Sequence, residues 1–409
     1  MNRVLITGLG AVSPYGRGVD TLINSIMEGK SGIRRLEELA KIRGLNSRVA
    51  GLVPDIDPRE IPRKYRRSMS NMSIFAVLAC QEALRQAGLG TEECAGGQMG
   101  VAIGSTTGSI QATQEFFENY FNSGGLEQMK STFFFKIMNH SCAANISKVF
   151  GLTGRILSPS AACSTSCQAI GYGYEMIAFG RQRYMLCGGA DEFHPLTAGA
   201  FDVLNAASVK FNEQPHRTPR PFDRERDGVV CSEGSGIILL ESLSSARKRD
   251  VPILAEIIGF ATISDPNSIA NPDVDSIELC MRKALNDAGI EPQQIDYINA
   301  HATATVQGDL AEGEAIFRLF GNNVPVSSLK GHLGHALAAS GALELCAVVG
   351  MLNRQCMIPT LNLDNVDELC KNIRHVKSLT TENLQLVIKN NFALGGVNSS
   401  LVLRRYQND

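Results

Sequence analysis

Cys163 lies where a short extended segment is expected to turn into a helix. Residues 158–167 read SPSAACSTSC, and a helix is predicted to follow them through about Arg181. The positive end of a helix dipole lowers the pKa of a nearby thiol, and small neighbours leave room for a substrate. Most of the eleven cysteines are expected to be small core residues. The position of Cys163 therefore suggests a nucleophile, which needs support from other residues.

His301 is a second candidate for chemistry. Residues 297–309 read YINAHATATVQGD, so a predicted strand delivers the imidazole into a loop of small and hydroxyl residues. This layout is typical of a catalytic imidazole beside a bound ligand. A histidine after a strand is as often structural, so His301 alone is weak evidence.

A third cluster lies in residues 327–341, which read SSLKGHLGHALAASG. His332 and His335 are three residues apart, a spacing that invites a metal site. No third ligand lies nearby in the sequence, and zinc sites usually show more ligands at recognisable spacing, so no metal is expected. Lys330 close to His335 predicts an electropositive pocket for a carboxylate or a developing enolate.

The elements that would position these residues alternate between apolar strands and amphipathic helices, which predicts an α/β fold with a largely buried sheet. Residues 83–89 (ALRQAGL) resemble residues 284–290 (ALNDAGI), and each segment ends a helix with a glycine before a strand. The offset, 284 − 83 = 201 residues, is close to half the chain and predicts a duplicated fold. Strands are expected at 4–7, 100–104, 184–190, 236–241, 295–300, 386–391 and 399–403, and a helix with one buried face covers 343–351.

Composition excludes several classes of protein. A formal net charge of −2 over 409 residues gives no overall attraction to nucleic acid or to an anionic membrane. We expect no apolar run near the ~18 residues of a membrane helix, and the N-terminus lacks a signal peptide. The odd number of cysteines without a CxxC pair indicates a reducing cytoplasm. The segment Gly8-Leu9-Gly10 is weak evidence for dinucleotide binding because Pro14 falls where the helix should start, and no GxSxG elbow supports a serine hydrolase.

Taken together, these segments resemble the β-ketoacyl–acyl carrier protein synthases, the synthase I/II branch of the thiolase-like fold. The resemblance runs in the order of that family from residues 4–14 (VLITGLGAVSP) through 221–228 (PFDRERDG) to 391–398 (NFALGGVN). It implies an internally duplicated fold of two βαβαβαββ halves in five layers, α-β-α-β-α. The expected halves are residues 1–250, which carry the cysteine, and 251–409, which carry the two histidines.

The resemblance also implies a role for individual residues. Cys163 matches the acyl-carrying nucleophile, and its backbone N–H would form an oxyanion hole with that of Leu394. His301 and His335 match the histidines that stabilise the enolate formed when malonyl loses carbon dioxide. The remaining matches are the lysine of that site and its ion-pair partner (Lys330, Glu344), the threonines that hold the phosphopantetheine arm (Thr303, Thr305), the acyl pocket (Thr107, Leu394), and the surface where an acidic carrier protein docks (Arg63, Lys64, Arg66, Arg67, Lys210).

Several departures from the common synthase II pattern leave the acyl substrate open. Ala302 and Ala304 replace a Gly and a Ser, His332 is additional, and Ala393 and Leu394 replace a Gly and a Phe of the gating loop. The leading hypothesis is chain elongation in fatty acid synthesis, with acyl carrier protein as partner, no cofactor of its own, and a homodimeric state.

The alternative is the ketosynthase of a type II polyketide pathway, paired with a subunit that lacks the cysteine. A thiolase-type enzyme acting on coenzyme A esters is less favoured because of His335, and a non-catalytic scaffold because the reactive set is complete.

Overall fold

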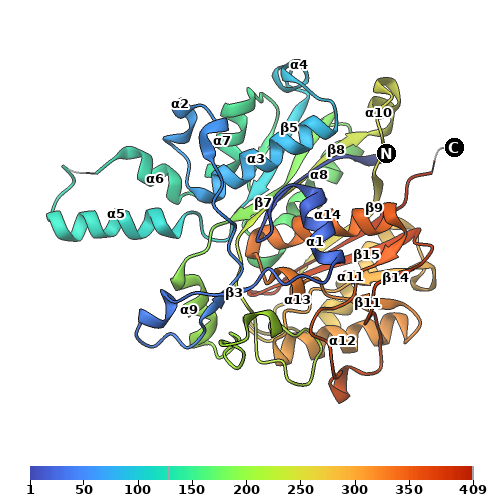
Figure 1. Ribbon diagram of the computed structural model, residues 1–409. Helices are drawn as coiled ribbons and strands as arrows, with labels where there is room; N and C mark the ends of the chain where they lie inside the picture. Colours follow the sequence, from blue (N-terminus) through green and yellow to red (C-terminus); the bar gives the residue numbers. More distant parts are fainter. Residues whose placement is uncertain (128, 408–409) are drawn as a thin grey trace.

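The protein consists of two halves with the same order of elements. The computed structural model describes residues 1–127 and 129–407 (Figure 1). The first half comprises β1 (Val4–Ser13), α3 (Asn71–Gln86), β5 (Met99–Gly104), α7 (Ser141–Phe150), β6 (Ile156–Leu157), α8 (Thr165–Ala178), β7 (Tyr184–Asp191) and β8 (Gly234–Ser242). The second comprises β9 (Ala255–Ser264), α11 (Val274–Ala288), β10 (Tyr297–Asn299), α12 (Val306–Phe320), β11 (Pro325–Ser327), α14 (Ser340–Arg354), β15 (Leu386–Ala393) and β16 (Val397–Arg404).

The strand order and the strand directions confirm the predicted duplication. The first half has the order β6-β5-β7-β8-β1, and the second has β11-β10-β15-β16-β9. In each half the first two neighbouring pairs are parallel and the next two are antiparallel. The halves join where Val4–Ile6 of β1 pairs with Ala255–Ile257 of β9, so one hydrogen-bonded path of eleven strands crosses the molecule.

Helices cover both faces of each half-sheet and produce the five expected layers (Figure 1). Helix α3 packs on β1 and β8, and α7 packs on β5, which makes the first outer layer. Helices α8 and α14 contact strands of both halves and form the central layer. Helix α11 packs on β9 and β16 with α12 beside it, as the second outer layer.

The repeated helix ending that suggested duplication occupies equivalent places in the two halves. Helices α3 and α11 each follow the first strand of a half, and Gly88 and Gly289 just beyond them have φ angles of 59° and 64°. Only glycine adopts this left-handed conformation without a steric cost. The glycines of Gly8-Leu9-Gly10 also have a packing role, because a Cβ at Gly10 would lie 1.9 Å from the carbonyl oxygen of Ala79 in α3.

All seven predicted strands are present, with ends shifted by a few residues. The sequence did not predict β9, the ten-residue strand that joins the halves. Its second residue, Glu256, is buried, and the carboxylate is hydrogen-bonded by Arg3 at 2.8 Å and by Arg404 at 3.1 Å. A buried carboxylate is tolerated when it is paired in this way.

One expectation about apolar segments is wrong. Residues 337–354 are long and apolar enough to cross a membrane, and 89% of them are buried inside the protein. Helix α14 is apolar because it lies in the central layer, with protein on every side. The eleven cysteines are all free and buried, as expected for small core residues.

Candidate active site

Three of the candidate segments meet at one edge of the second half-sheet. Strands β15, β10 and β11 are parallel neighbours, so their carboxyl ends lie at the same edge. His301 follows β10, Lys330 follows β11 and begins the short helix α13 (Lys330–Leu333), and Leu394 follows β15. The carboxyl ends of parallel strands are where α/β proteins place ligands. Residues far apart in the sequence are thereby brought together.

Cys163 reaches this edge from the central layer. It lies in a single 3-10 turn, Ala162–Ser164, directly before α8. Ala162 has φ 45°, a conformation that an L-residue adopts only when its surroundings hold it there. The backbone N–H groups of Leu394 and Cys163 both face the thiol, and the side-chain amide of Asn391 donates to the Cys163 carbonyl at 3.2 Å. Two convergent N–H groups at a reactive sulfur are the geometry of an oxyanion hole.

The second half contains a turn equivalent to the Cys163 turn, but a protein carboxylate already occupies it. Residues Leu337–Ala339 form the same 3-10 turn before α14, and Leu337 has φ 51°. There the carboxylate of Asp191 accepts the N–H of Ala338 at 2.8 Å. The Asp191 carboxylate therefore occupies the position at this turn that a substrate oxyanion would take at the Cys163 turn.

One thiol and two imidazoles converge at the open turn. One reactive atom from each of Cys163, His301 and His335 lies within 4.8 Å of the others. The two imidazole rings stand edge to face, with centroids 5.4 Å apart and an interplanar angle of 82°. This donor set could also hold a soft divalent ion such as zinc. His332, the other histidine of that segment, is buried with its Nε2 on the Pro359 carbonyl at 3.0 Å and belongs to a different environment.

The hydrogen bonds of His335 determine which ring nitrogen carries the proton. Its Nδ1 accepts the Leu337 N–H at 3.2 Å and lies 2.8 Å from the Ser340 hydroxyl. A nitrogen that accepts an N–H carries no proton itself, so the neutral ring has its hydrogen on Nε2. Within the described residues Nε2 is buried and has no hydrogen-bond partner. His335 therefore presents an unused N–H donor to the site.

His301 is positioned through its backbone by a residue that the sequence did not reveal. The buried carboxylate of Glu312, on α12, accepts the N–H of His301 at 2.9 Å and that of Ala302 at 2.7 Å. The ring itself has only a long contact, 3.5 Å, between Nδ1 and the amide of Asn391. The tautomer of His301 is thus less constrained than that of His335. Glu312 is the seventh residue of α12, nearly two turns from the start of the helix, and could have been suspected from its place on an apolar face.

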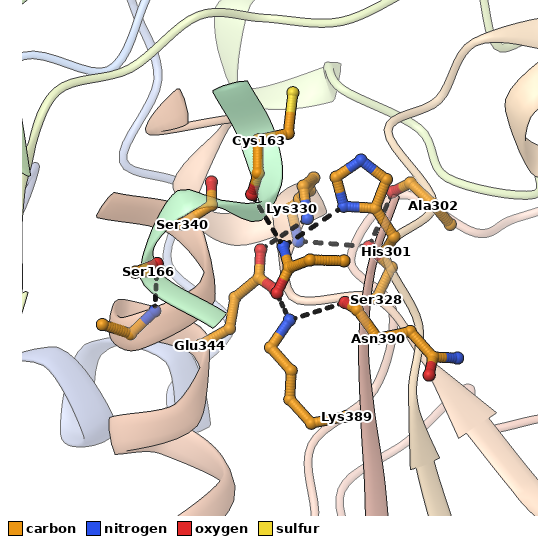
Figure 2. Close-up of polar contacts among 12 residues, drawn as sticks. Cys163, Ser166, His301, Ala302, Ser328, Lys330, Ser340, Glu344, Lys389 and Asn390 are labelled. Carbon is orange, nitrogen blue, oxygen red and sulfur yellow. Dashed lines mark hydrogen bonds and ion pairs between the residues drawn. The ribbon is translucent and has the colours of Figure 1, made fainter. Parts of the chain in front are cut away.

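Two buried lysines share one glutamate close to the ring of His301 (Figure 2). Lys330 contacts Oε1 of Glu344 at 2.5 Å, which places this expected ion pair in the site. Lys389, on β15, contacts Oε2 of the same carboxylate and was not among the predicted residues. A lysine inside a sequence that reads as a buried strand gave no signal of function.

Burial governs the protonation of the site. It raises the pKa of the Cys163 thiol to about 11, although the N–H of Leu394 and the charge of Lys330 act in the opposite direction. The expectation of a lowered thiol pKa is therefore wrong for the resting protein. Burial, together with Lys330 and Lys389, also lowers the pKa of His301 and His335 well below its usual value. The resting site holds a neutral thiol and neutral imidazoles.

A cavity of about 290 Å³ leads to these groups. Thr303 and Thr305 line it with their hydroxyls 3.0 Å apart, and Leu394, 42% exposed, also lines it. Thr107 is exposed and does not line this cavity, so the expected contribution to the acyl pocket is not made within a single chain.

The expected docking residues lie on the surface, in two places. Arg63, Lys64 and Arg67 in and beside α2 (Arg63–Arg66) are exposed, whereas the Nε of Arg66 donates to the Ile61 carbonyl at 2.8 Å. None of these four lines the cavity. Lys210 is exposed and adjoins the cavity, because its backbone N–H bonds at 2.7 Å to Asp227, a lining residue.

Comparison with known proteins gives a consistent result. Family profiles described as "Beta-ketoacyl synthase, N-terminal domain" and "Beta-ketoacyl synthase, C-terminal domain" match residues 1–246 and 254–364. The 3-oxoacyl-[acyl-carrier-protein] synthase 1 of Haemophilus influenzae is 34% identical, over 99% of this chain and 100% of its own length. A crystal structure of a beta-ketoacyl synthase from Burkholderia phymatum matches with a TM-score of 0.96 and 40% identity, over 100% of both chains. The ishigamide ketosynthase/chain length factor matches with a TM-score of 0.92 and 28% identity, over 99% of this chain and 100% of that chain.

Proposed function

The chain belongs to the beta-ketoacyl synthase family, and on that premise we propose that Cys163 carries the acyl chain while His301 and His335 act on the extender unit. The activity is that of a 3-oxoacyl-[acyl-carrier-protein] synthase, the condensing acyltransferase of fatty acid synthesis. The observation that carries the residue roles is the convergence of one thiol and two imidazoles within 4.8 Å beside the cavity.

The first half-reaction starts from a protonated thiol. A neutral imidazole takes the thiol proton, and His301 is the better acceptor because Nδ1 of His335 is already occupied and its Nε2 carries hydrogen. The sulfur attacks the carbonyl carbon of an acyl thioester, and the N–H groups of Leu394 and Cys163 stabilise the oxyanion. The carrier thiol leaves with the proton, and His301 returns to its neutral form.

The second half-reaction uses the donors that the first leaves free. When the malonyl carboxylate departs as carbon dioxide, the remaining electron pair forms an enolate, whose oxygen accepts from the Nε2–H of His335 and from His301. Lys330 adds positive charge nearby. The enolate carbon then attacks the acyl carbonyl on Cys163, the C–S bond breaks, and the extended 3-oxoacyl chain leaves on the carrier. The Cys163 sulfur leaves as a thiolate and takes up one proton from solvent, which restores the neutral thiol. The two backbone N–H groups serve both tetrahedral intermediates.

The cavity suits a phosphopantetheine arm that belongs to the carrier substrate. Thr303 and Thr305 supply paired hydroxyls along it, and Leu394 lines it with its side chain partly exposed. The enzyme needs no cofactor of its own in this scheme. An acidic carrier protein docks on the exposed cations of α2 and on Lys210 beside the cavity, by charge complementarity. The cytoplasm is the proposed location.

A second copy of this chain is the proposed subunit partner. Helices α5 (Ile110–Ser123) and α6 (Ser131–Ile137) extend from the body as an arm that carries exposed apolar side chains (Figure 1). Phe121 is 73% exposed and Phe134 is 58% exposed. Large apolar side chains that are exposed together on one arm mark a protein interface. Thr107 lies just before α5, so a dimer through this arm offers Thr107 a place beside the partner's acyl pocket.

Polyketide synthesis is the second candidate function, favoured by the match to a ketosynthase/chain length factor and by Leu394 in the gating loop. In that case the arm would contact a subunit without the cysteine. Purification of the chain alone gives a homodimer under the first proposal. A chain that is active only with a second, Cys-less protein would favour the alternative.

Mass spectrometry tests the nucleophile directly. After incubation with acyl-carrier protein, we expect one acyl-sized mass gain on the peptide that contains Cys163, and Cys163→Ala should abolish both this gain and condensation. Cys167→Ala is the matched control, because Cys167 lies one helical turn away and is fully buried. Acylation of Cys167, or condensation by Cys163→Ala, would overturn the assignment.

A further inference from the structure

The segment 221–228 contains a buried arginine to which the two half-reactions assign no role. The guanidinium of Arg226 is buried, and its Nη1 donates to Oδ2 of Asp367 at 2.7 Å. Its Nη2 donates to the carbonyl of Val306, the first residue of α12, at 3.3 Å. Its Nε lies 3.8 Å from Oδ2 of Asp309 and has no hydrogen-bond partner among the described residues. Burial of a guanidinium is costly, so its charge must be balanced by these carboxylates.

Asp309, on α12, links this arginine to the loop that carries the two threonines of the cavity. Its fully buried carboxylate accepts the N–H of Phe222 on Oδ2 at 2.7 Å and the N–H of Ala304 on Oδ1 at 3.1 Å. Ala304 has φ 68°, a left-handed conformation that a residue other than glycine keeps only when its surroundings hold it there. The hydrogen bond to Asp309 supplies this restraint on the turn.

The shape of this turn determines where the threonine hydroxyls lie. Thr303 and Thr305 flank Ala304, and their Oγ1 atoms are 3.0 Å apart at the wall of the catalytic cavity. The space around them is limited, because a Cβ at Gly308 would lie 2.5 Å from Oγ1 of Thr305. A hydroxyl forms a hydrogen bond only over a narrow range of distance and angle. A turn that relaxed would therefore move these hydroxyls out of reach of their ligand.

We propose that Arg226, acting through Asp309, is a positioning residue that sets the conformation of the turn with Thr303 and Thr305, and thereby the affinity for the amide groups of the phosphopantetheine arm. The proposal rests on the proposed function, since it assumes that both threonines bind the arm. Amide groups offer the carbonyl oxygens and N–H donors that hydroxyls bind. Neither Arg226 nor Asp309 lines the cavity, so the pair acts through the turn and leaves the chemistry at Cys163 unchanged.

The test measures carbon dioxide release by Arg226→Lys from two substrates, malonyl-carrier protein and S-ethyl malonyl thioester. The ethyl thioester has the reacting atoms but no amide groups. Lysine keeps the charge but cannot reproduce the planar set of donors. The loss of one or two hydrogen bonds to the arm should raise KM for malonyl-carrier protein about five- to thirty-fold, with kcat within about three-fold of the parent. The rate with the ethyl thioester should not change.

Arg220→Lys is the matched control. Arg220 is equally buried and directly precedes the same segment, but its guanidinium pairs with Asp223 and Asp364. This variant should lose a similar amount of thermal stability and keep the parent KM for both substrates. An equal rise of KM in Arg220→Lys would show a general effect of packing and would overturn the proposal.

A purely structural role for Arg226 would lower thermal stability and leave KM unchanged in the folded variant, which would overturn the proposal. An equal loss with both substrates would overturn it too, because the effect would then lie at the reacting atoms. If Arg226→Lys does not fold, Asp309→Asn decides, since an amide keeps the size of the side chain but cannot accept both the Ala304 and the Phe222 N–H groups. The same rise of KM is expected there, and an unchanged KM would overturn the proposal.

The double variant Thr303→Ala with Thr305→Ala separates this proposal from the proposed function. An unchanged KM for malonyl-carrier protein in the double variant would refute the binding of the arm by the threonines. A raised KM in the double variant, together with the parent KM in Arg226→Lys, would overturn the positioning role alone.

Discussion

His335 offers a quantitative test of the decarboxylation step. In His335→Ala the site loses the Nε2–H that is buried and has no partner among the described residues. A hydrogen bond to a developing oxyanion in a dry site contributes about 2.7–4 kcal/mol, so the loss of this donor should slow decarboxylation by about 10²–10³-fold. Acyl transfer to Cys163 should change far less, because the N–H groups of Leu394 and Cys163 remain.

The assay is release of labelled carbon dioxide from malonyl-carrier protein, with acyl transfer followed separately by mass spectrometry. His332→Ala is the matched control: the ring is equally buried, three residues away, but bonds to Pro359 away from the thiol. It should lower thermal stability, since a buried hydrogen bond contributes about 1 kcal/mol. The decarboxylation rate per folded molecule should stay within about three-fold of the parent, because the His332 ring does not reach the thiol. Decarboxylation by His335→Ala within about ten-fold of the parent rate would refute the donor role.

Further predictions concern the nucleophile, the docking surface, the gate and metals. Alkylation of Cys163 by iodoacetamide should be slow at pH 7 and rise up to pH 10, because burial raises the thiol pKa to about 11; a plateau by pH 8 would contradict this. Arg63→Glu with Arg67→Glu should raise KM for carrier substrates, most strongly at low salt, and an unchanged KM would remove α2 from the docking surface. Leu394→Phe should shift preference among short, long and polyunsaturated acyl-carriers by about ten-fold, whereas identical profiles would mean that Leu394 is only packing. Dialysis against EDTA should preserve activity and added zinc should inhibit it, because the thiol and the imidazoles together can bind the ion; loss of activity with EDTA would indicate a resident metal.

The sequence alone indicated the candidate residues whose signal is local. Cys163 before a predicted helix and His301 after a predicted strand were singled out because small residues surround them, and Lys330 because it lies close to His335. The echo of residues 83–89 in 284–290 revealed the duplication for the same reason, since a helix ending needs a glycine at one position. Resemblance to a known family then connected segments that the chain separates by more than a hundred residues.

Tertiary structure decided what depends on burial and on partners from other elements. Lys389 and Glu312 read as ordinary members of a strand and a helix, and their relation to the site exists only because β15, α12 and α14 meet close to the ring of His301. The thiol pKa of Cys163 depends on how much water the fold removes, which outweighs the effect that local position predicts. Thr107 lies outside the cavity for a similar reason, because neighbours in space, rather than in sequence, determine which surface a residue lines.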